Sequence, residues 1–250
     1  MPAMKVWDGS QWKDIQNIYY WNGSSWVKAK AGYYWDGSQW VQFWGLYEVI
    51  WHCDPIAEKV YELSTSDFSV IKSANSPEDS PHGIGGDSDT IWHCDPNVDK
   101  VYELSTSDFS VIRSASSPYR YPYGIGGNSD TIWHCDSRVD KVYELSTVDF
   151  SVIRSASSPE EGPYGIGGDS DTIWNSDITL DKLFELSVSD FSVIKSAYSP
   201  STQPYGIGGD SDTIWHCDSN VDKVYELSTN FSVIRSGNSP STAPFGIGGK

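Results

Sequence analysis

The sequence predicts an all-β fold: a five-bladed β-propeller preceded by a small domain of β-hairpins. Three observations support this prediction. The pentapeptide Ile-Trp-His-Cys-Asp, with one variant copy, occurs five times, and successive copies start 41 residues apart, at positions 50, 91, 132, 173 and 214. Each unit of this length contains four short β-type segments, which is the composition of a propeller blade. The last unit is followed by an additional copy of the segment that opens a unit.

The first 45 residues contain a shorter repeat, Trp-Asp/Asn-Gly-Ser-x-Trp, in three copies that start 14 residues apart. Asp-Gly and Asn-Gly are the strongest short hairpin signals, so each copy predicts a β-hairpin with tryptophans opposite one another. The expected pairs are Trp7 with Trp12, Trp21 with Trp26, and Trp35 with Trp40. Three hairpins bury little surface by themselves. Residues 1–45 are therefore predicted to be an anchor or oligomerisation domain; a simple β-cap on the propeller is the alternative.

One complete unit shows the four predicted strands of a blade. Its segments 123–127, 131–136, 141–147 and 150–156 are short and rich in β-branched and aromatic residues. Such segments favour strands, and none has the length or the 3.6-residue periodicity of a helix. Glycine, asparagine, serine and aspartate between them are turn formers. Each unit therefore predicts four antiparallel strands.

The five units occupy residues 46–250, and their ends indicate how the ring closes. No Gly-Ile-Gly-Gly segment precedes Ile50, so the first unit begins at its second strand. The chain ends on Pro244-Phe-Gly-Ile-Gly-Gly-Lys250, a first strand without a unit of its own. Adding this strand to the first blade would pair two open sheet edges. We expect a closed ring; an open stack continued by another subunit is the alternative.

Two family resemblances accompany these patterns. The wording Pro-Tyr-Gly-Ile-Gly-Gly-x-Ser-Asp-Thr-Ile-Trp, with Asp-Lys-Val-Tyr-Glu-Leu, resembles the NHL and YVTN-type propeller repeats over residues 46–250. That resemblance implies the fold but no single function, because such repeats serve lectins, enzymes and protein-binding platforms. The N-terminal Trp-Asp-Gly-Ser-x-Trp pattern resembles short hairpin repeats in minor tail and fibre proteins of tailed phages and archaeal viruses. It implies a virion appendage that attaches through its N-terminus.

Composition restricts the partners. The chain has 34 acidic and 17 basic side chains, a net charge of −17 and a pI near 4.4. Binding to nucleic acid needs clustered lysine and arginine, so no nucleic acid partner is expected. No apolar segment of a signal peptide follows Met1, and no run of residues is long enough to span a membrane. We therefore expect no membrane insertion, and a virion protein assembled in the host cytoplasm.

The repeated cysteine, histidine and aspartate residues do not form a recognisable metal site, so no metal and no cofactor are expected. Cys53, Cys94, Cys135 and Cys217 occupy one equivalent position on separate units, too far apart for disulfides. Adjacent histidine and cysteine side chains on a strand point to opposite faces and cannot easily share a zinc ion. The Asp-Ser-Asp turns are expected to be hairpin formers, with calcium binding as the alternative.

An enzymatic activity is not expected. Acid–base catalysis requires two carboxyl groups in different environments, whereas the acidic residues of this chain repeat in register. No Ser-His-Asp signature and no phosphate-binding loop occurs in the sequence.

Two connections of each unit vary between copies, whereas the other two hardly change. The junction between successive units and the link between the second and third strands are the variable ones. In an antiparallel blade these two connections lie on the same rim of the ring. Loops on a rigid scaffold commonly carry binding residues, so this rim is the predicted recognition surface. Unconstrained sequence drift is the alternative.

Aromatic residues mark the candidate ligand-binding site on this rim. In each copy, a residue with an aromatic side chain directly follows the proline at the end of the junction. In addition, one junction combines aromatic and guanidinium groups, as binding hot spots do. The first set comprises His82, Tyr123, Tyr164, Tyr205 and Phe245; the second comprises Tyr119, Arg120 and Tyr121.

Together these patterns predict a virion structural protein without enzymatic activity, either a tail fibre or a capsid-surface appendage of a tailed virus. Its hairpins would bind other virion proteins, its propeller would bind a host-surface glycan or protein, and it would be a homo-oligomer. The alternative is a free microbial propeller lectin or a protein-interaction platform.

Overall fold

The computed structural model of the chain comprises two compact units, Met1–Glu48 and Val49–Lys250. The residues it describes are 5–7, 12–14, 19–21, 26–28, 31–35, 37, 40–45, 49–87 and 89–249. In the first unit the description covers the strand backbones and Gly37. The described residues include no helix with the length and apolar character that crossing a membrane requires.

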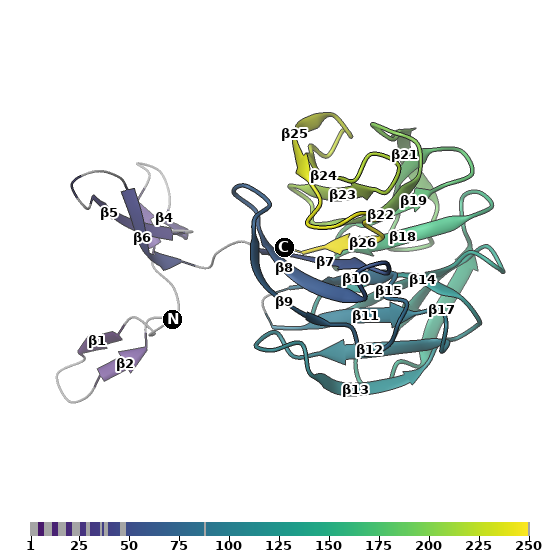
Figure 1. Cartoon of the computed structure of the whole chain (residues 1–250), viewed down its shortest axis with the longest axis horizontal. Coiled ribbons are helices and arrows are strands. Elements are labelled where there is room, and N and C mark those ends of the chain that lie inside the picture. Colours follow the sequence, from purple (N-terminus) through teal and green to yellow (C-terminus); the bar gives the residue numbers. More distant parts are fainter. Residues whose placement is uncertain are drawn as a thin grey trace. The chain divides into compact units, whose positions relative to one another are not determined.

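The N-terminal unit contains three separate antiparallel hairpins (Figure 1). They are β1 (Lys5–Trp7) with β2 (Trp12–Asp14), β3 (Tyr19–Trp21) with β4 (Trp26–Lys28), and β5 (Ala31–Trp35) with β6 (Trp40–Gly45). The strand registers pair Trp7 with Trp12, Trp21 with Trp26, and Trp35 with Trp40. Gly37 has a φ of 104°, in the left-handed region that an Asp-Gly turn uses. The backbone therefore has the tryptophan register predicted from the sequence; the anchoring role of this unit stays a prediction.

The second unit is a five-bladed β-propeller of four-stranded antiparallel sheets. The first blade contains β26 (Gly246–Gly248), β7 (Val49–Asp54), β8 (Lys59–Ser64) and β9 (Val70–Asn75). The second contains β10 (Gly83–Gly86), β11 (Ile91–Asp95), β12 (Lys100–Leu104) and β13 (Val111–Ser116). The third contains β14 (Pro122–Gly127), β15 (Ile132–Asp136), β16 (Lys141–Leu145) and β17 (Val152–Ser157). The fourth contains β18 (Pro163–Gly168), β19 (Ile173–Asp177), β20 (Lys182–Leu186) and β21 (Val193–Tyr198). The fifth contains β22 (Pro204–Gly209), β23 (Ile214–Asp218), β24 (Lys223–Leu227) and β25 (Val233–Asn238).

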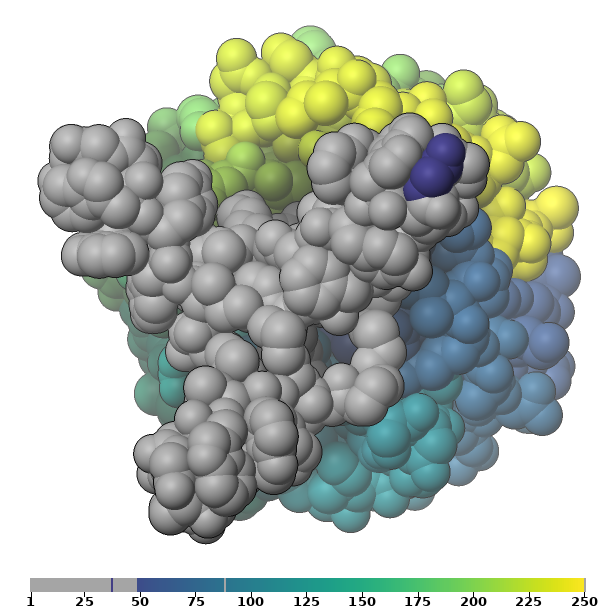
Figure 2. Space-filling model, turned by 90° about the vertical axis from the view of Figure 1, so that its left-hand side faces the viewer, coloured from purple at the N-terminus to yellow at the C-terminus, as the bar shows by residue number. Residues whose placement is uncertain are grey.

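The last strand of the chain closes the ring. β26 pairs antiparallel with β7, and Ile247 lies opposite His52 in the register. In Figure 1 the yellow β26 lies beside the blue β7. Figure 2 shows the coloured blades following one another in sequence order, so that the yellow fifth blade adjoins the blue first blade. The predicted five-bladed ring with a C-terminal closing strand is confirmed.

The outer strand of each blade begins later than the sequence pattern predicts. In the third blade, β17 starts at Val152, not at Phe150. Phe150 lies in the preceding turn with a φ of 61°, and its buried ring makes an edge contact with Trp92 of the second blade at 5.8 Å. Its apolar character therefore reflects packing between blades rather than membership of the strand.

The core lies between the blades, so each apolar cluster contains residues from two neighbouring sheets. One cluster joins Trp92 and Val101 of the second blade to Ile132 and Leu145 of the third. Another joins Trp215 of the fifth blade to residues of the first, which extends the core around the whole ring. Because both faces of the middle strands are covered, β11, β15, β19 and β23 are buried along their entire lengths.

Glycines let the inner strands converge around a narrow axis. A Cβ atom on Gly126 would lie 2.9 Å from the Cα of Gly167 in the next blade, which is closer than real Cβ contacts. A Cβ on Gly124 would lie 2.5 Å from the carbonyl oxygen of Tyr164. Only residues without a side chain allow this approach. The inner strands can therefore bring the residues at their ends together at the axis.

The repeated histidines and cysteines are buried between blades. His93 donates from Nδ1 to the Gly83 carbonyl at 2.7 Å, and its Nε2 lies 3.2 Å from the Ser76 hydroxyl of the first blade. All four cysteines are buried and free. In the fourth blade, Asn175 donates to the Gly165 carbonyl at 2.7 Å and Ser176 donates to Tyr205 O at 3.0 Å. These substitutes make equivalent contacts, so the positions serve blade packing.

Candidate ligand-binding surface on the variable rim

The two variable connections lie on one rim and contact each other. We call residues 78–80, 119–121, 160–162, 201–203 and 241–243 the first to fifth junctions, and residues 55–58, 96–99, 137–140, 178–181 and 219–222 the first to fifth links. The backbone N–H of Tyr121 donates to the Asp99 carboxylate at 2.9 Å. The same contact joins Gly162 to Asp140 at 3.0 Å, Gln203 to Asp181 at 3.0 Å, and Ala243 to Asp222 at 3.1 Å. The last residue of a link thus holds the neighbouring junction, and together these segments form the variable rim.

The aromatic residues that follow each junction proline form a closed ring at the inner mouth of the variable rim. Neighbouring centroids are separated by 5.1 Å for His82–Tyr123, 4.3 Å for Tyr123–Tyr164, 4.9 Å for Tyr164–Tyr205, 4.1 Å for Tyr205–Phe245 and 4.7 Å for Phe245–His82. All five side chains are half-buried. We call these five residues the aromatic ring. The structure therefore brings together five predicted site residues that come from all five blades.

The aromatic ring is electrically neutral at neutral pH. Burial lowers the pKa of His82 to about 4, and its Nδ1–H donates to the Ser80 carbonyl at 3.0 Å. Burial also raises the pKa of Tyr164 and of Tyr205 above the usual tyrosine range. The mouth of the ring consequently presents aromatic edges and faces together with hydroxyl groups.

Tyr121 extends the aromatic ring outward over the third blade. Its ring stacks on Tyr123 with a centroid distance of 6.3 Å and an interplanar angle of 15°. The guanidinium of Arg138 lies 5.3 Å from the Tyr121 centroid, an arrangement that cation–π attraction favours. Tyr121 has a φ of 65°, and the hydrogen bond that its backbone N–H donates to the Asp99 carboxylate holds this left-handed conformation. The side chain is 39% exposed, so a ligand can reach it.

The other two residues of the second junction point to solvent. Tyr119 is 47% exposed, and within the described part of the chain it makes no aromatic stacking contact with the ring. Arg120 is exposed and has no ion pair with a described residue. The structure thus adds Tyr121 to the ring and places Tyr119 and Arg120 beside it.

The contributions of Asp99 and Arg138 to this surface were not predicted from the sequence. A signal for Asp99 was present, because aspartate ends four of the five links while the other link residues change. Arg138 has no equivalent in the other copies, and its position over Tyr121 depends on how a link and a junction face each other. That contact requires the three-dimensional structure.

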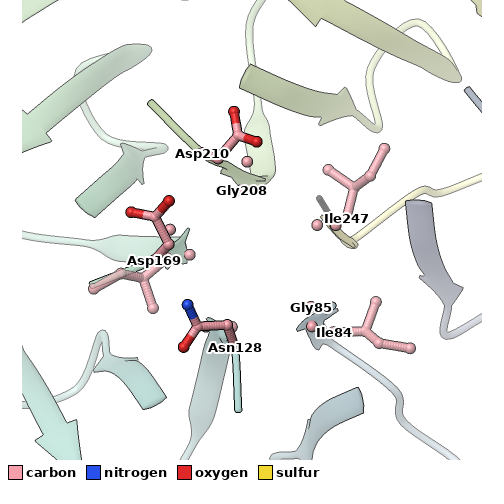
Figure 3. A pocket seen from close by; sticks show the side chains of 16 residues that line it. Ile84, Gly85, Asn128, Asp169, Gly208, Asp210 and Ile247 are labelled. Carbon is pink, nitrogen blue, oxygen red and sulfur yellow. The ribbon is translucent and has the colours of Figure 1, made fainter. Parts of the chain in front are cut away.

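The inner strands surround a central channel along the axis of the propeller. Its mouth on the rim opposite the variable rim is narrow and is built from the constant turns. Figure 3 shows Asn128, Asp169 and Asp210 around an opening lined by inner-strand glycines. Its volume of about 10 Å³ accommodates roughly one water molecule. Carboxylates of these turns cap backbone N–H groups: Asp87 accepts from Asp89 at 2.8 Å and from Thr90 at 2.9 Å. In the described part of the chain no three His, Cys, Asp or Glu side chains converge as a metal site.

Comparisons with known proteins identify the fold. No protein-family model and no curated protein sequence matches the chain. A streptogramin B lyase structure is 17% identical with a TM-score of 0.50, covering 93% of this chain and 83% of that one. Virginiamycin B lyase from Staphylococcus aureus is 18% identical with a TM-score of 0.50, covering 90% and 84%. Glutaminyl cyclase from Myxococcus xanthus is 11% identical with a TM-score of 0.53, covering 63% and 76%. At these identities the likeness shows a shared β-propeller fold and no activity. The resemblance of the N-terminal hairpins to viral repeats stays a prediction.

Proposed function

We propose that the protein is a non-enzymatic structural and binding protein that recognises a surface glycan through the variable rim of its propeller. The observation that carries this proposal is the aromatic ring with Tyr121 stacked on its edge. These side chains are half-buried or exposed, they gather where the copies differ in sequence, and a rigid scaffold holds them. Binding residues are commonly arranged in this way.

The geometry of the aromatic ring suits a sugar. Aromatic faces provide apolar contact area for the C–H face of a pyranose, and tyrosine hydroxyls offer hydrogen bonds to its hydroxyl groups. The ring centroids of neighbouring side chains are 4.1 to 5.1 Å apart, so the five side chains already pack against one another. Little side-chain freedom is therefore lost when a ligand binds. Preorganisation of this kind lowers the entropic cost of association.

In the specific form of the proposal, the protein is a tail fibre or capsid-surface appendage of a tailed virus. The hairpin register sets Trp7, Trp21 and Trp35 opposite Trp12, Trp26 and Trp40. Small hairpins with this many tryptophans need a further surface to cover them, which virion proteins or other copies of the chain would supply. A free lectin is the alternative. Detection of the chain in purified particles would favour the appendage, whereas purified monomers that bind glycans without such particles would favour the lectin.

Replacing Tyr119, Arg120 and Tyr121 by alanine tests the binding role. Each stacked aromatic contact contributes about 0.5–1.5 kcal/mol, so the triple variant should lose roughly tenfold or more in affinity on a glycan array. Its thermal unfolding should change little, because Tyr119 and Tyr121 are 47% and 39% exposed. Tyr198→Ala is the control: Tyr198 is 74% exposed at the end of the outer strand β21, on the same rim but not a member of the aromatic ring. Unchanged glycan binding by the triple variant would refute the proposal.

A further inference from the structure

We propose that the glycan bound by the variable rim carries primary ammonium groups. This inference rests on the proposed function and adds the chemical class of the ligand. It is drawn from carboxylates beside the aromatic ring that have no basic partner, and from buried oxygen atoms beneath them that have no hydrogen-bond donor.

The junctions on either side of Tyr119–Tyr121 are acidic. The first junction contains Glu78 and Asp79, and the third contains Glu160 and Glu161. The ion pairs between described residues all lie elsewhere, between a third-strand glutamate and an outer-strand lysine or arginine. These pairs are Glu62–Lys72, Glu103–Arg113, Glu144–Arg154, Glu185–Lys195 and Glu226–Arg235. None of the four junction carboxylates forms an ion pair with a described residue, and Arg120 is the single cation of these three junctions. The other cations on this rim are Arg138 of the third link and the lysine that follows each link.

An internal comparison shows what is unusual beneath the first junction. At the fifth junction, Ser241 donates to the Asp54 carboxylate at 2.5 Å and accepts from the Tyr61 hydroxyl at 3.4 Å. The serine thus completes a buried polar triad. In the first junction Glu78 occupies the position equivalent to Ser241, near Asp95 and Tyr102 of the second blade.

The tyrosine hydroxyl beside Glu78 has no partner. Tyr102 is 3% exposed, and its hydroxyl makes no hydrogen bond with any described residue. Burial and the nearby carboxylates of Glu78 and Asp95 raise its pKa. Glu78 itself is only half-buried. A ligand that supplies N–H donors would complete this cluster of oxygens.

A second unpartnered oxygen lies under the middle junction. Asp136 is fully buried, and its Oδ2 accepts no hydrogen bond from a described residue. Here Tyr119 stands at the position equivalent to Ser241. The Asp218 Oδ2 under the fourth junction, where Ser201 takes this position, is likewise unpartnered. The junctions around Tyr121 thus combine an exposed aromatic face with spare acceptor atoms.

An ammonium group complements this arrangement better than a neutral or anionic group does. It offers three N–H donors and no acceptor, and it is attracted to aromatic faces. The opposite rim, which carries the constant turns such as Asp87–Thr90 and which we call the constant rim, is also acidic. It lies a strand length away, about 17–20 Å. That separation exceeds the Debye length of about 8 Å at physiological salt, so the constant rim contributes little to the field at the aromatic ring.

Three oligosaccharides of equal length test the proposal by calorimetry: oligomers of glucosamine, of N-acetylglucosamine and of glucose. The wild-type chain should bind glucosamine oligomers at least tenfold more tightly than the other two, and this advantage should fall as salt rises from 50 to 500 mM. A quadruple variant, Glu78→Gln, Asp79→Asn, Glu160→Gln and Glu161→Gln, should lose the advantage.

The matched control removes four carboxylates from the constant rim: Asp89→Asn, Asp130→Asn, Asp171→Asn and Asp212→Asn. These four residues are exposed, and both quadruple variants change the net charge equally. The control should keep the preference for glucosamine. Equal affinity of the wild type for the three oligomers, or equal loss in both quadruple variants, would overturn the ammonium preference. Neither result would affect the proposed function, which instead fails if the alanine variant of the second junction binds glycans normally.

Discussion

Buried histidines link neighbouring blades through uncharged hydrogen bonds. His52, His93, His134 and His216 are fully buried, and burial lowers the pKa of each to about 4. The ring of His93 also lies against Tyr102, with centroids 5.8 Å apart. Protonation would place a positive charge between two sheets without a compensating carboxylate in hydrogen-bond contact. The neutral form is therefore the one that the fold stabilises.

Replacing His93 by asparagine should weaken the acid sensitivity of the fold. The folded-state pKa of about 4 lies below the ordinary histidine pKa of 6.5, so the unfolded chain binds more protons between these two pH values. The contribution of His93 to stability is thus complete above pH 6.5 and is lost as the pH falls toward 4. Relative to wild type, His93→Asn should gain about 2 kcal/mol in the free energy of unfolding when the pH is lowered from 7 to 5.

Urea denaturation of both proteins at pH 7 and pH 5 measures this difference. Asparagine is the appropriate replacement because Asn175 makes the equivalent hydrogen bond in the fourth blade. Buried carboxyl groups titrate in the opposite sense: burial raises the pKa of Asp136 and of Asp218 to about 6. They contribute equally to both proteins, so the comparison isolates His93. Parallel pH dependence in the two proteins would show that this histidine does not titrate as described.

At the scale of strands, each outer strand sends a basic side chain across to the next blade. Arg113 on β13 pairs with Glu103 of its own blade and donates to the carbonyls of Thr147 and Val148 in the third blade. Its guanidinium also lies 4.7 Å from the centroid of Phe150. Arg235 makes the same contacts from the fifth blade to the first, including one to Ser66. These strands therefore fasten the blades together at the perimeter.

Removing one such side chain should destabilise the whole ring. Arg113→Met loses charge-assisted hydrogen bonds that contribute about 1.5–3 kcal/mol. Because the Arg113 side chain is 31% exposed, solvent screening reduces this, and we expect a loss of about 1–2 kcal/mol in urea unfolding. Arg113→Lys should retain most of the stability, since Lys72 and Lys195 occupy this position in other blades. Arg120→Met is the control; an equal effect of Arg120→Met and Arg113→Met would contradict the role.

The sequence predicted the strands well where periodicity was local. Turn residues separated the segments clearly, so the number and order of strands in a blade followed from one unit. The outer strand was extended to Phe150, because an apolar residue in a left-handed turn resembles a strand residue until its partner, Trp92, is known. The perimeter role of Arg113 was missed for the same reason: its partners lie in the next repeat.

The same distinction applies to the whole molecule and its site. Closure could be predicted, because the strand missing at the start is present at the end of the chain. The gathering of His82, Tyr123, Tyr164, Tyr205 and Phe245 at one mouth followed from equivalent positions in a ring. The stacking of Tyr121 on Tyr123, fixed by Asp99 and Arg138, could not be predicted, since it depends on how two different loops meet.

Closure of the ring by β26 makes the stability of every blade depend on the last residues of the chain. Deleting residues 244–250 removes the inner strand of the first blade, the buried Ile247 and one member of the aromatic ring, Phe245. It also leaves β7 with an unpaired edge, which favours aggregation. The truncated chain should unfold at a lower temperature than wild type, by more than the roughly 2–4 °C that 1 kcal/mol represents in a domain of this size. It should also elute as larger species in size-exclusion chromatography.

A relocated strand distinguishes loss of the strand from loss of chain length. Inserting Pro-Phe-Gly-Ile-Gly-Gly followed by Asn-Ser-Asp ahead of Val49, in the chain lacking residues 244–250, would offer β7 the same strand through a hairpin. That connection is the one the third blade uses between β14 and β15. This variant should recover monomeric elution and most of the thermal stability, because antiparallel pairing with β7 does not depend on which end supplies the strand. Unchanged unfolding of the truncated chain, or no recovery on relocation, would show that stability does not depend on closure by β26.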